Sequence, residues 1–248
     1  MCHGDDARPP FPPVSGGETA TRGDVTLRAA DGNEFMAYAA RAARPSGTGM
    51  VILPDVRGLH DYYKELADRF AEVGIDAVAF DYFGRTAGMG SRGEEFVYRP
   101  HVEQTTPEGV DNDTAAAIAH LRSPDGGSVE RVFTVGFCFG GSNSWRQSAA
   151  QPGLAGAIGF YGGPGRVREV IGQMKAPLLV LVAGDDFTPV AEFEQFDREL
   201  GEAGLPHRMV VYEGAPHSFF DRTFAEHAAA CDDAWRQMLD FVGLPVSV

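Results

Sequence analysis

The stretch Val-Gly-Phe-Cys-Phe-Gly-Gly, residues 135–141, places one cysteine between two glycines that each lie two positions away. A strand-like run, residues 131–135, precedes it, and a helical pattern, residues 141–151, follows it. A side chain on a tight turn between a strand and a helix is held up at the carboxyl edge of a sheet, and the glycines avoid a clash where helix and strand meet. The stretch therefore predicts an accessible, reactive Cys138; a buried and inert thiol is the alternative.

Strands and helices alternate along the rest of the chain. Strand-like runs lie at residues 24–29, 34–41, 50–53, 75–80, 131–135, 156–160, 177–183 and 208–212, and helical runs at about residues 61–73, 111–121, 141–151, 190–203 and 224–242. The first two strands flank Asp31-Gly32-Asn33, which predicts a hairpin. Alternation with continuous apolar strands is typical of an α/β fold, with a mostly parallel central sheet flanked by helices on both faces.

The sequence predicts two parts of unequal size. Residues 1–23 are rich in proline and glycine, and we expect them to form an N-terminal arm. We expect residues 24–248 to form a single α/β domain, since no linker divides them. Residues 85–107 interrupt the alternation with a charged, glycine-rich segment of the kind that often forms binding loops.

Composition excludes several classes of partner. The formal net charge of −14 argues against nucleic acid or an anionic membrane surface, because both select for lysine and arginine. No apolar run approaches the roughly 18 residues of a membrane-spanning helix, and the N-terminus lacks the apolar core of a secretory signal. Three cysteines do not make a disulfide framework, which favours a cytoplasmic location. The oligomeric state cannot be predicted from these features.

Residue types that ligate metals also occur in the arm, at Cys2, His3, Asp5 and Asp6. They lie in a proline- and glycine-rich tail that gives them no fixed geometry. We therefore predict no metal site and no organic cofactor.

A cysteine nucleophile needs a base, and the base needs an acid to orient it. Asp185 and Asp186 follow the strand-like run 177–183, and His217 follows the run 208–212. Because the carboxyl ends of parallel strands meet at one edge of a sheet, we expect these side chains to lie near Cys138. The chain order of nucleophile, acid and histidine is the order found with a nucleophile turn of this kind.

The turn also predicts how a reacting carbonyl would be stabilised. The helix that follows Cys138 presents its unpaired N–H groups to the sulfur, which favours a thiolate. The N–H of Phe139, the next residue, would donate to an oxyanion in the same space. Phe139 is therefore predicted as part of an oxyanion hole.

Residues 24–243 resemble the dienelactone hydrolase family of α/β-hydrolases. Three motifs carry the resemblance: GFCFGG around Cys138, AGDDFTP around the acid, and APHSFFDR around the histidine. The resemblance implies an α/β-hydrolase fold and a catalytic triad of Cys138, Asp185 and His217. Within the acid pair it selects Asp185, which lies four residues before Pro189, and it includes Ser218 in the substrate site.

The segment Ile-Leu-Pro-Asp-Val-Arg-Gly, residues 52–58, also resembles the family. The resemblance implies that Asp55 is an acid that interacts with the resting thiol and that Val56 gives the second oxyanion N–H. The family has glutamate at the position of Asp55. The alternative is that Asp55 caps a turn.

Two arginines bind the substrate carboxylate in dienelactone hydrolase. Arg85, in the segment FDYFGR, matches the first. The position of the second is Asp221 here, and the arginine comes one residue later, at Arg222. The resemblance implies a carboxylate clamp of Arg85 and Arg222 if the loop shifts by one residue. The alternative is that these arginines pair with the chain's own carboxylates.

The sequence thus predicts an esterase or lactonase that hydrolyses a small ester or enol-lactone, with or without a carboxylate, through a thioester on Cys138. Two alternatives stand beside it. One is a hydrolase-like binding protein with a silent site. The other is an amidotransferase with a cysteine triad, although that class places an acid two residues after the histidine and this chain has Phe219 there.

Overall fold

The computed structural model describes residues 3–13, 17–90, 92, 93 and 95–244. The chain divides into two compact units. The hairpin unit comprises Ser15–Val132, and the cysteine unit comprises Met1–Val14 together with Phe133–Val248. The predicted division into an arm and one domain remains a prediction.

The hairpin unit has four strands in the order β1-β2-β4-β3. They are β1 (Thr19–Arg28), β2 (Glu34–Ala42), β3 (Thr48–Leu53) and β4 (Ile75–Phe80). The first two form the predicted antiparallel hairpin, β2 pairs antiparallel with β4, and β3 pairs parallel with β4. Every residue of β3 and β4 is buried, as their continuous apolar sequences predict.

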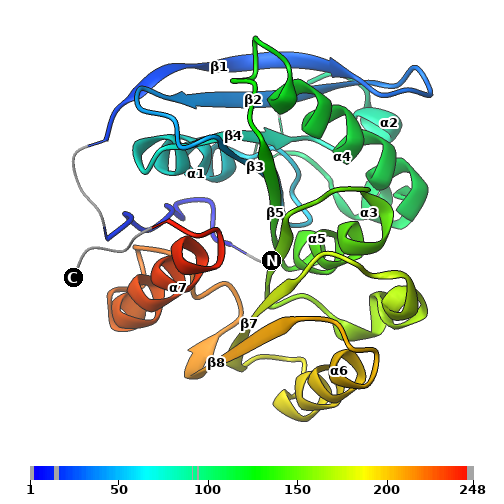
Figure 1. Cartoon of the computed structure of the whole chain (residues 1–248), viewed down its shortest axis with the longest axis vertical. Helices are drawn as coiled ribbons and strands as arrows, with labels where there is room; N and C mark the ends of the chain where they lie inside the picture. The colour runs from blue at the N-terminus through cyan, green and yellow to red at the C-terminus, as the bar shows by residue number, and fades with distance from the viewer. Residues whose placement is uncertain (1–2, 14–16, 91, 94, 245–248) are drawn as a thin grey trace. The chain divides into compact units, whose positions relative to one another are not determined.

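Four helices belong to the hairpin unit: α1 (Asp61–Glu72), α2 (Gly84–Ala87), α3 (Arg99–Gln104) and α4 (Pro107–Arg122). Helix α1 begins where the ring of His60 accepts a hydrogen bond from the backbone N–H of Tyr62, and it buries Leu66 and Phe70 at helical spacing. Figure 1 shows α1 and α4 on opposite faces of the strands. The interrupted segment 85–107 contributes the short helices α2 and α3, which the sequence did not predict.

The cysteine unit has four strands in the order β5-β6-β7-β8, and each neighbouring pair is parallel. They are β5 (Arg131–Phe137), of which Phe133 onward belongs to this unit, β6 (Gly156–Phe160), β7 (Leu178–Asp185) and β8 (His207–Pro216). Helices α5 (Phe139–Ala150), α6 (Val190–Glu202) and α7 (Ala228–Phe241) accompany them, with 3-10 turns at Pro164–Arg166, Arg168–Gln173 and Ala225–His227. In Figure 1, α7 lies on one face of β7 and β8, and α6 lies on the other.

The predicted α/β class with mostly parallel strands is confirmed. Within the two units, four strand pairs are parallel and two are antiparallel. Six of the eight strands are longer than predicted, and β4 and β6 have the predicted bounds. Among the longer ones, β1 begins at Thr19, β7 continues to Asp185, and β8 continues to Pro216. Strand β7 reaches Asp185 through an irregularity after Ala183, and this extension decides which acid meets the histidine.

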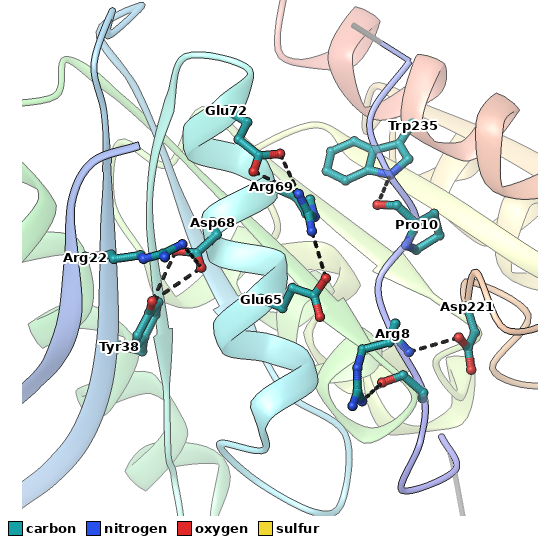
Figure 2. A network of polar contacts seen from close by, with 11 residues as sticks. Arg8, Pro10, Arg22, Tyr38, Glu65, Asp68, Arg69, Glu72, Asp221 and Trp235 are labelled. Carbon is teal, nitrogen blue, oxygen red and sulfur yellow. Dashed lines mark hydrogen bonds and ion pairs between the residues drawn. The ribbon is translucent and has the colours of Figure 1, made fainter. Parts of the chain in front are cut away.

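The described part of the arm, residues 3–13, is fixed to the cysteine unit. The backbone N–H of Arg8 donates to Asp221 Oδ1 at 3.0 Å, and the indole N–H of Trp235 donates to the carbonyl oxygen of Pro10 at 3.1 Å (Figure 2). His3 and Ala7 are buried. These residues are therefore an ordered covering of their unit, whereas Thr19 onward joins the sheet of the hairpin unit as β1.

Figure 2 also shows the ion pairs and the hydrogen bond that the side chains of α1 make within the hairpin unit. Arg22 of β1 and the hydroxyl of Tyr38 both bind Asp68, at 3.0 and 3.1 Å. Arg69 binds Glu65 and Glu72 along the helix, each at 2.8 Å. Among the described residues, no helix is both long enough and apolar enough to cross a membrane.

Candidate active site

Cys138 occupies the predicted turn between β5 and α5. Its backbone has φ 56° and ψ −114°, a conformation that L-residues rarely adopt. The turn is fixed on both sides, since Cys138 N–H donates to Phe160 O and Gly141 N–H donates to Cys138 O, each at 3.0 Å. The side chain is half-buried, so it is not core filler. Strain at one residue, held by its surroundings, is a common property of functional sites.

Glycines make this turn possible. A Cβ on Gly136 would lie 1.9 Å from the carbonyl oxygen of Gly140, and a Cβ on Gly141 would lie 2.5 Å from the carbonyl oxygen of Phe160. No side chain fits at either distance. The role predicted for Gly136 is therefore explained by the close approach of α5 to its own strand.

Phe139 is the first residue of α5 and directly follows Cys138. Its backbone N–H belongs to the first turn of the helix, where N–H groups have no partner within the helix. The helix dipole there favours negative charge on the neighbouring sulfur. The role of Phe139 as an oxyanion donor remains a prediction.

His217 lies just beyond the end of β8 and pairs with a carboxylate that follows β7. Its Nδ1 lies 2.7 Å from Asp186 Oδ2, and the Asp186 side chain is only 1% exposed. Its Nε2 is buried and has no nitrogen or oxygen partner in the described part of the chain. The ring is thus held from Nδ1, which leaves Nε2 for a proton transfer.

The carboxylate that contacts His217 is Asp186 and not Asp185, the acid that the resemblance implies. Asp185 is the last residue of β7, pairs with Pro216 in the strand ladder, and is exposed. The strand ends at Asp185, and the chain bends at Asp186. The side chain of Asp186, one residue further on, reaches the imidazole instead.

The surroundings of His217 favour its charged form. Burial alone would lower the pKa of the imidazole, but hydrogen bonds to Asp186 and Cys138, and the negative charges of both, outweigh it and raise the pKa to about 9. At neutral pH the ring is then an imidazolium. A thiolate on Cys138 is its natural partner.

Two aromatic rings that the sequence did not predict lie against His217. The ring of Tyr161, which follows β6, is 4.8 Å away between centroids, and the ring of Phe187, which follows Asp186, is 4.4 Å away. Phe187 is 77% exposed, which is unusual for a large apolar residue. The position of Tyr161 directly after a strand was the available signal, because strand ends carry the site in this fold class.

Ser218 is buried and has a positive φ of 67°. Its hydroxyl has no hydrogen-bond partner among the described residues. It shapes the turn that carries His217. Its contact with substrate remains a prediction.

Asp55, in the hairpin unit, is fully buried and partnered within that unit. One carboxylate oxygen accepts the backbone N–H of Arg57 at 2.8 Å, and Nε of Arg57 lies 3.3 Å from the other oxygen. These contacts match the turn-capping alternative. The predicted interaction with the resting thiol and the oxyanion role of Val56 remain predictions.

Arg85, predicted to bind a substrate carboxylate, pairs with two carboxylates of its own unit. Its guanidinium donates Nε and Nη2 to the buried Asp113 at 3.0 and 2.8 Å, and Nη1 to Asp31 at 2.7 Å. A bidentate pair with a second carboxylate is a structural ion-pair network. Arg85 therefore joins α2, α4 and the hairpin turn, and its contact with substrate remains a prediction.

Arg222 lies in the loop after His217, where its guanidinium covers the ring of Phe11 at 4.6 Å and its backbone N–H donates to Arg8 O at 3.0 Å. Asp221 accepts backbone N–H groups from Arg8 and Thr223. This loop binds the arm, and the predicted clamp of Arg85 and Arg222 remains a prediction.

The described residues do not include a cluster of side chains that could bind a metal ion. Residues 3–13, 17–90, 92, 93 and 95–244 contain no group of three histidine, cysteine, aspartate or glutamate residues that could hold an ion. Cys2, one of the residues considered above, lies outside these ranges.

Known proteins are similar to this chain in sequence and in fold. The sequence profile of the dienelactone hydrolase family matches residues 35–244. The carboxymethylenebutenolidase of Rhodococcus opacus is 27% identical over 255 residues, which cover 97% of this chain and 96% of that protein.

Solved structures agree. A Klebsiella pneumoniae protein with the name "putative dienelactone hydrolase" has a TM-score of 0.75 and 25% identity, over 90% of this chain and 99% of that one. A dienelactone hydrolase-like promiscuous phosphotriesterase from metagenomic libraries has a TM-score of 0.69 at 19% identity, over 88% and 99%, and shows the shared fold. The predicted α/β-hydrolase fold is confirmed, and the chain belongs to the dienelactone hydrolase family of hydrolases.

Proposed function

We propose that the protein hydrolyses a small ester or lactone through a covalent thioester on Cys138. His217 moves the proton and Asp186 orients it. The observation that carries this proposal is the 2.7 Å contact between His217 Nδ1 and Asp186 Oδ2, on an imidazole whose pKa is also raised by the neighbouring Cys138. The three residues come from the ends of β5, β7 and β8.

The reaction begins from a thiolate and an imidazolium. The sulfur of Cys138 attacks the acyl carbon, and the carbonyl oxygen takes the negative charge next to the N–H of Phe139. When the carbon–oxygen bond breaks, the leaving alkoxide takes the proton from His217 Nε2. The products of this half-reaction are an alcohol and an acyl group on the sulfur.

The second half-reaction uses the same groups in reverse. His217, now neutral, removes a proton from water, and the hydroxide attacks the thioester carbon. The thiolate leaves and again faces an imidazolium, so the enzyme returns to its starting state. Asp186 stabilises the charged ring each time it forms. No step uses a metal or an organic cofactor.

The arginines change the expected substrate. Arg85 is occupied by Asp31 and Asp113, so a carboxylate on the substrate has no clamp of the predicted kind. We therefore propose a small ester or lactone without a required carboxylate. Comparing a carboxylate-bearing dienelactone with neutral short-chain esters tests this directly.

Active-site titration tests the enzyme against the binding-protein alternative. We expect iodoacetamide to label Cys138 with a stoichiometry of about one and a p-nitrophenyl ester to give a burst of the same size. Cys138→Ala should lose both and keep its circular dichroism spectrum. Slow labelling with no burst in the wild-type protein would support the silent binding protein instead.

A further inference from the structure

His3, in the N-terminal arm, contacts a tyrosine that packs against the proposed catalytic histidine. Its Nε2 lies 3.2 Å from the hydroxyl oxygen of Tyr161. Both side chains are buried, with His3 only 2% exposed and Tyr161 3%. A buried phenol needs a hydrogen-bond partner, and His3 provides one for Tyr161.

Tyr161 is itself held in an unusual backbone conformation. It has φ 37°, although it is not a glycine, and its N–H donates to Leu181 O of β7 at 2.8 Å. Its ring lies 4.8 Å from the ring of His217 and 5.8 Å from the ring of Phe219. Because strained residues persist only when their surroundings hold them, the contacts of the Tyr161 side chain matter to its position.

The imidazole of His217 must keep one orientation, with Nδ1 on Asp186 and Nε2 free for proton transfer. A ring packed against it limits its rotation. Whatever fixes the ring of Tyr161 therefore also limits the movement of His217.

The arm is tied to the loop of the histidine at a second place. Arg8 N–H donates to Asp221, and Arg222 N–H donates to Arg8 O, both at 3.0 Å. Asp221 and Arg222 lie four and five residues after His217. Figure 2 shows the arm running past Asp221 and Trp235, with Arg8 and Pro10 as contact points. These anchors bring His3 to a defined position at the far end of the described arm.

We propose that His3 is a positioning residue of the active centre: it fixes Tyr161, and Tyr161 fixes the ring of His217. The arm is then required for turnover and not only for stability. This inference rests on the proposed function of Cys138 and His217.

Kinetics of point variants test the inference. His3→Ala and Tyr161→Phe should each lower kcat roughly tenfold or more, because a misoriented base loses rate without losing substrate binding, and KM should stay within about twofold. His3→Gln, which keeps a polar group near the phenol, should recover most of kcat. The double variant of His3→Ala and Tyr161→Phe should be no slower than either single variant. His227→Ala is the matched control, because it removes another histidine of the same unit, one that lies outside the proposed active site.

A second measurement needs no substrate. The rate at which iodoacetamide alkylates Cys138 is followed against pH in each variant. A loosened His217 stabilises the thiolate less, so the rise of the rate should shift to higher pH in His3→Ala and not in His227→Ala. If Cys138 of the wild-type protein is alkylated rapidly but the protein hydrolyses no ester, the proposed function is contradicted. The comparison of alkylation rates between His3→Ala and His227→Ala still tests the role of His3.

The inference is overturned if His3→Ala keeps the wild-type kcat and alkylation profile, or if the effects of the two single variants add in the double variant. If His3→Ala does not fold by circular dichroism, Tyr161→Phe and His3→Gln carry the same test. Wild-type kcat in Tyr161→Phe would then overturn it.

Discussion

Asp186 Oδ2 lies 2.7 Å from His217 Nδ1, while the adjacent Asp185 is exposed. Strand β7 ends at Asp185, and the chain bends at Asp186, whose side chain reaches the imidazole. One residue of register thus decides which carboxylate orients the histidine. The same contact explains why the imidazole pKa is raised in spite of burial.

The acid pair can be resolved by matched variants. Asp186→Asn should lower kcat by about 10²–10⁴-fold, because the amide holds the imidazole in the wrong tautomer and does not stabilise its charge. Asp185→Asn should stay within about twofold, since its side chain faces solvent. Ester hydrolysis by both variants measures this. Equal losses, or a larger loss in Asp185→Asn, would refute the assignment.

The pH profile should report the raised pKa of His217. Hydrolysis of an ethyl ester needs the imidazolium to protonate the alkoxide, so kcat/KM should fall as pH rises through about 9. Asp186 stabilises the charged ring and so raises its pKa. Asp186→Asn should therefore move this fall to lower pH, by on the order of one unit or more.

A p-nitrophenyl ester serves as the control for that profile, because its leaving group needs no proton. Its acylation burst should persist above pH 9. A fall of kcat/KM for the ethyl ester at the same pH in wild type and Asp186→Asn would show that His217 is not the group that titrates.

The turn should tolerate no side chain at Gly136. Gly136→Ala places a Cβ 1.9 Å from the carbonyl oxygen of Gly140, and we expect a loss of about 3 kcal/mol or more in the free energy of unfolding. Gly165→Ala is the control, since no atom lies within 4 Å of its Cβ. Urea denaturation followed by circular dichroism gives both values, and equal stability of the two variants would contradict this account of the turn.

Arg85 should matter for stability and not for substrate binding. Arg85→Ala leaves the buried Asp113 without its bidentate partner, which we expect to cost about 2–4 kcal/mol of unfolding free energy. Replacing both residues by leucine should recover much of this loss, because no buried charge is then left unpaired. KM for a carboxylate-bearing ester should not change in either variant. A KM raised tenfold at unchanged stability would restore Arg85 to the substrate site.

The alternation of strands and helices could be predicted from the sequence, because buried parallel strands are continuous apolar runs. Strands β4 and β6, for example, have the predicted bounds. The sequence was also sufficient for the turn at Cys138, because the close approach of helix and strand excludes side chains at Gly136. It could not separate Asp185 from Asp186, because the local irregularity of β7 sets that register.

Two other features depended on contacts between distant segments. The pairing of Arg85 with Asp31 and Asp113 depends on the hairpin turn and α4 meeting at one point, which no local pattern encodes. The ordering of the arm depends on two hydrogen bonds between residues more than 200 positions apart: Arg8 N–H donates to Asp221, and the indole N–H of Trp235 donates to the carbonyl oxygen of Pro10. Composition alone indicated a poorly ordered or surface-bound segment there.

Trapping the covalent intermediate tests the central claim most directly. The protein is mixed with a slowly hydrolysed p-nitrophenyl ester, quenched in acid, and its intact mass and peptides are measured by mass spectrometry. We predict one acyl group on Cys138, removable by hydroxylamine as a thioester is. It should accumulate in the control variant Cys231→Ala, which removes the buried free thiol of α7, and it should be absent from Cys138→Ala. Hydrolysis with no adduct on Cys138, or an adduct on another residue that survives in Cys138→Ala, would contradict the account.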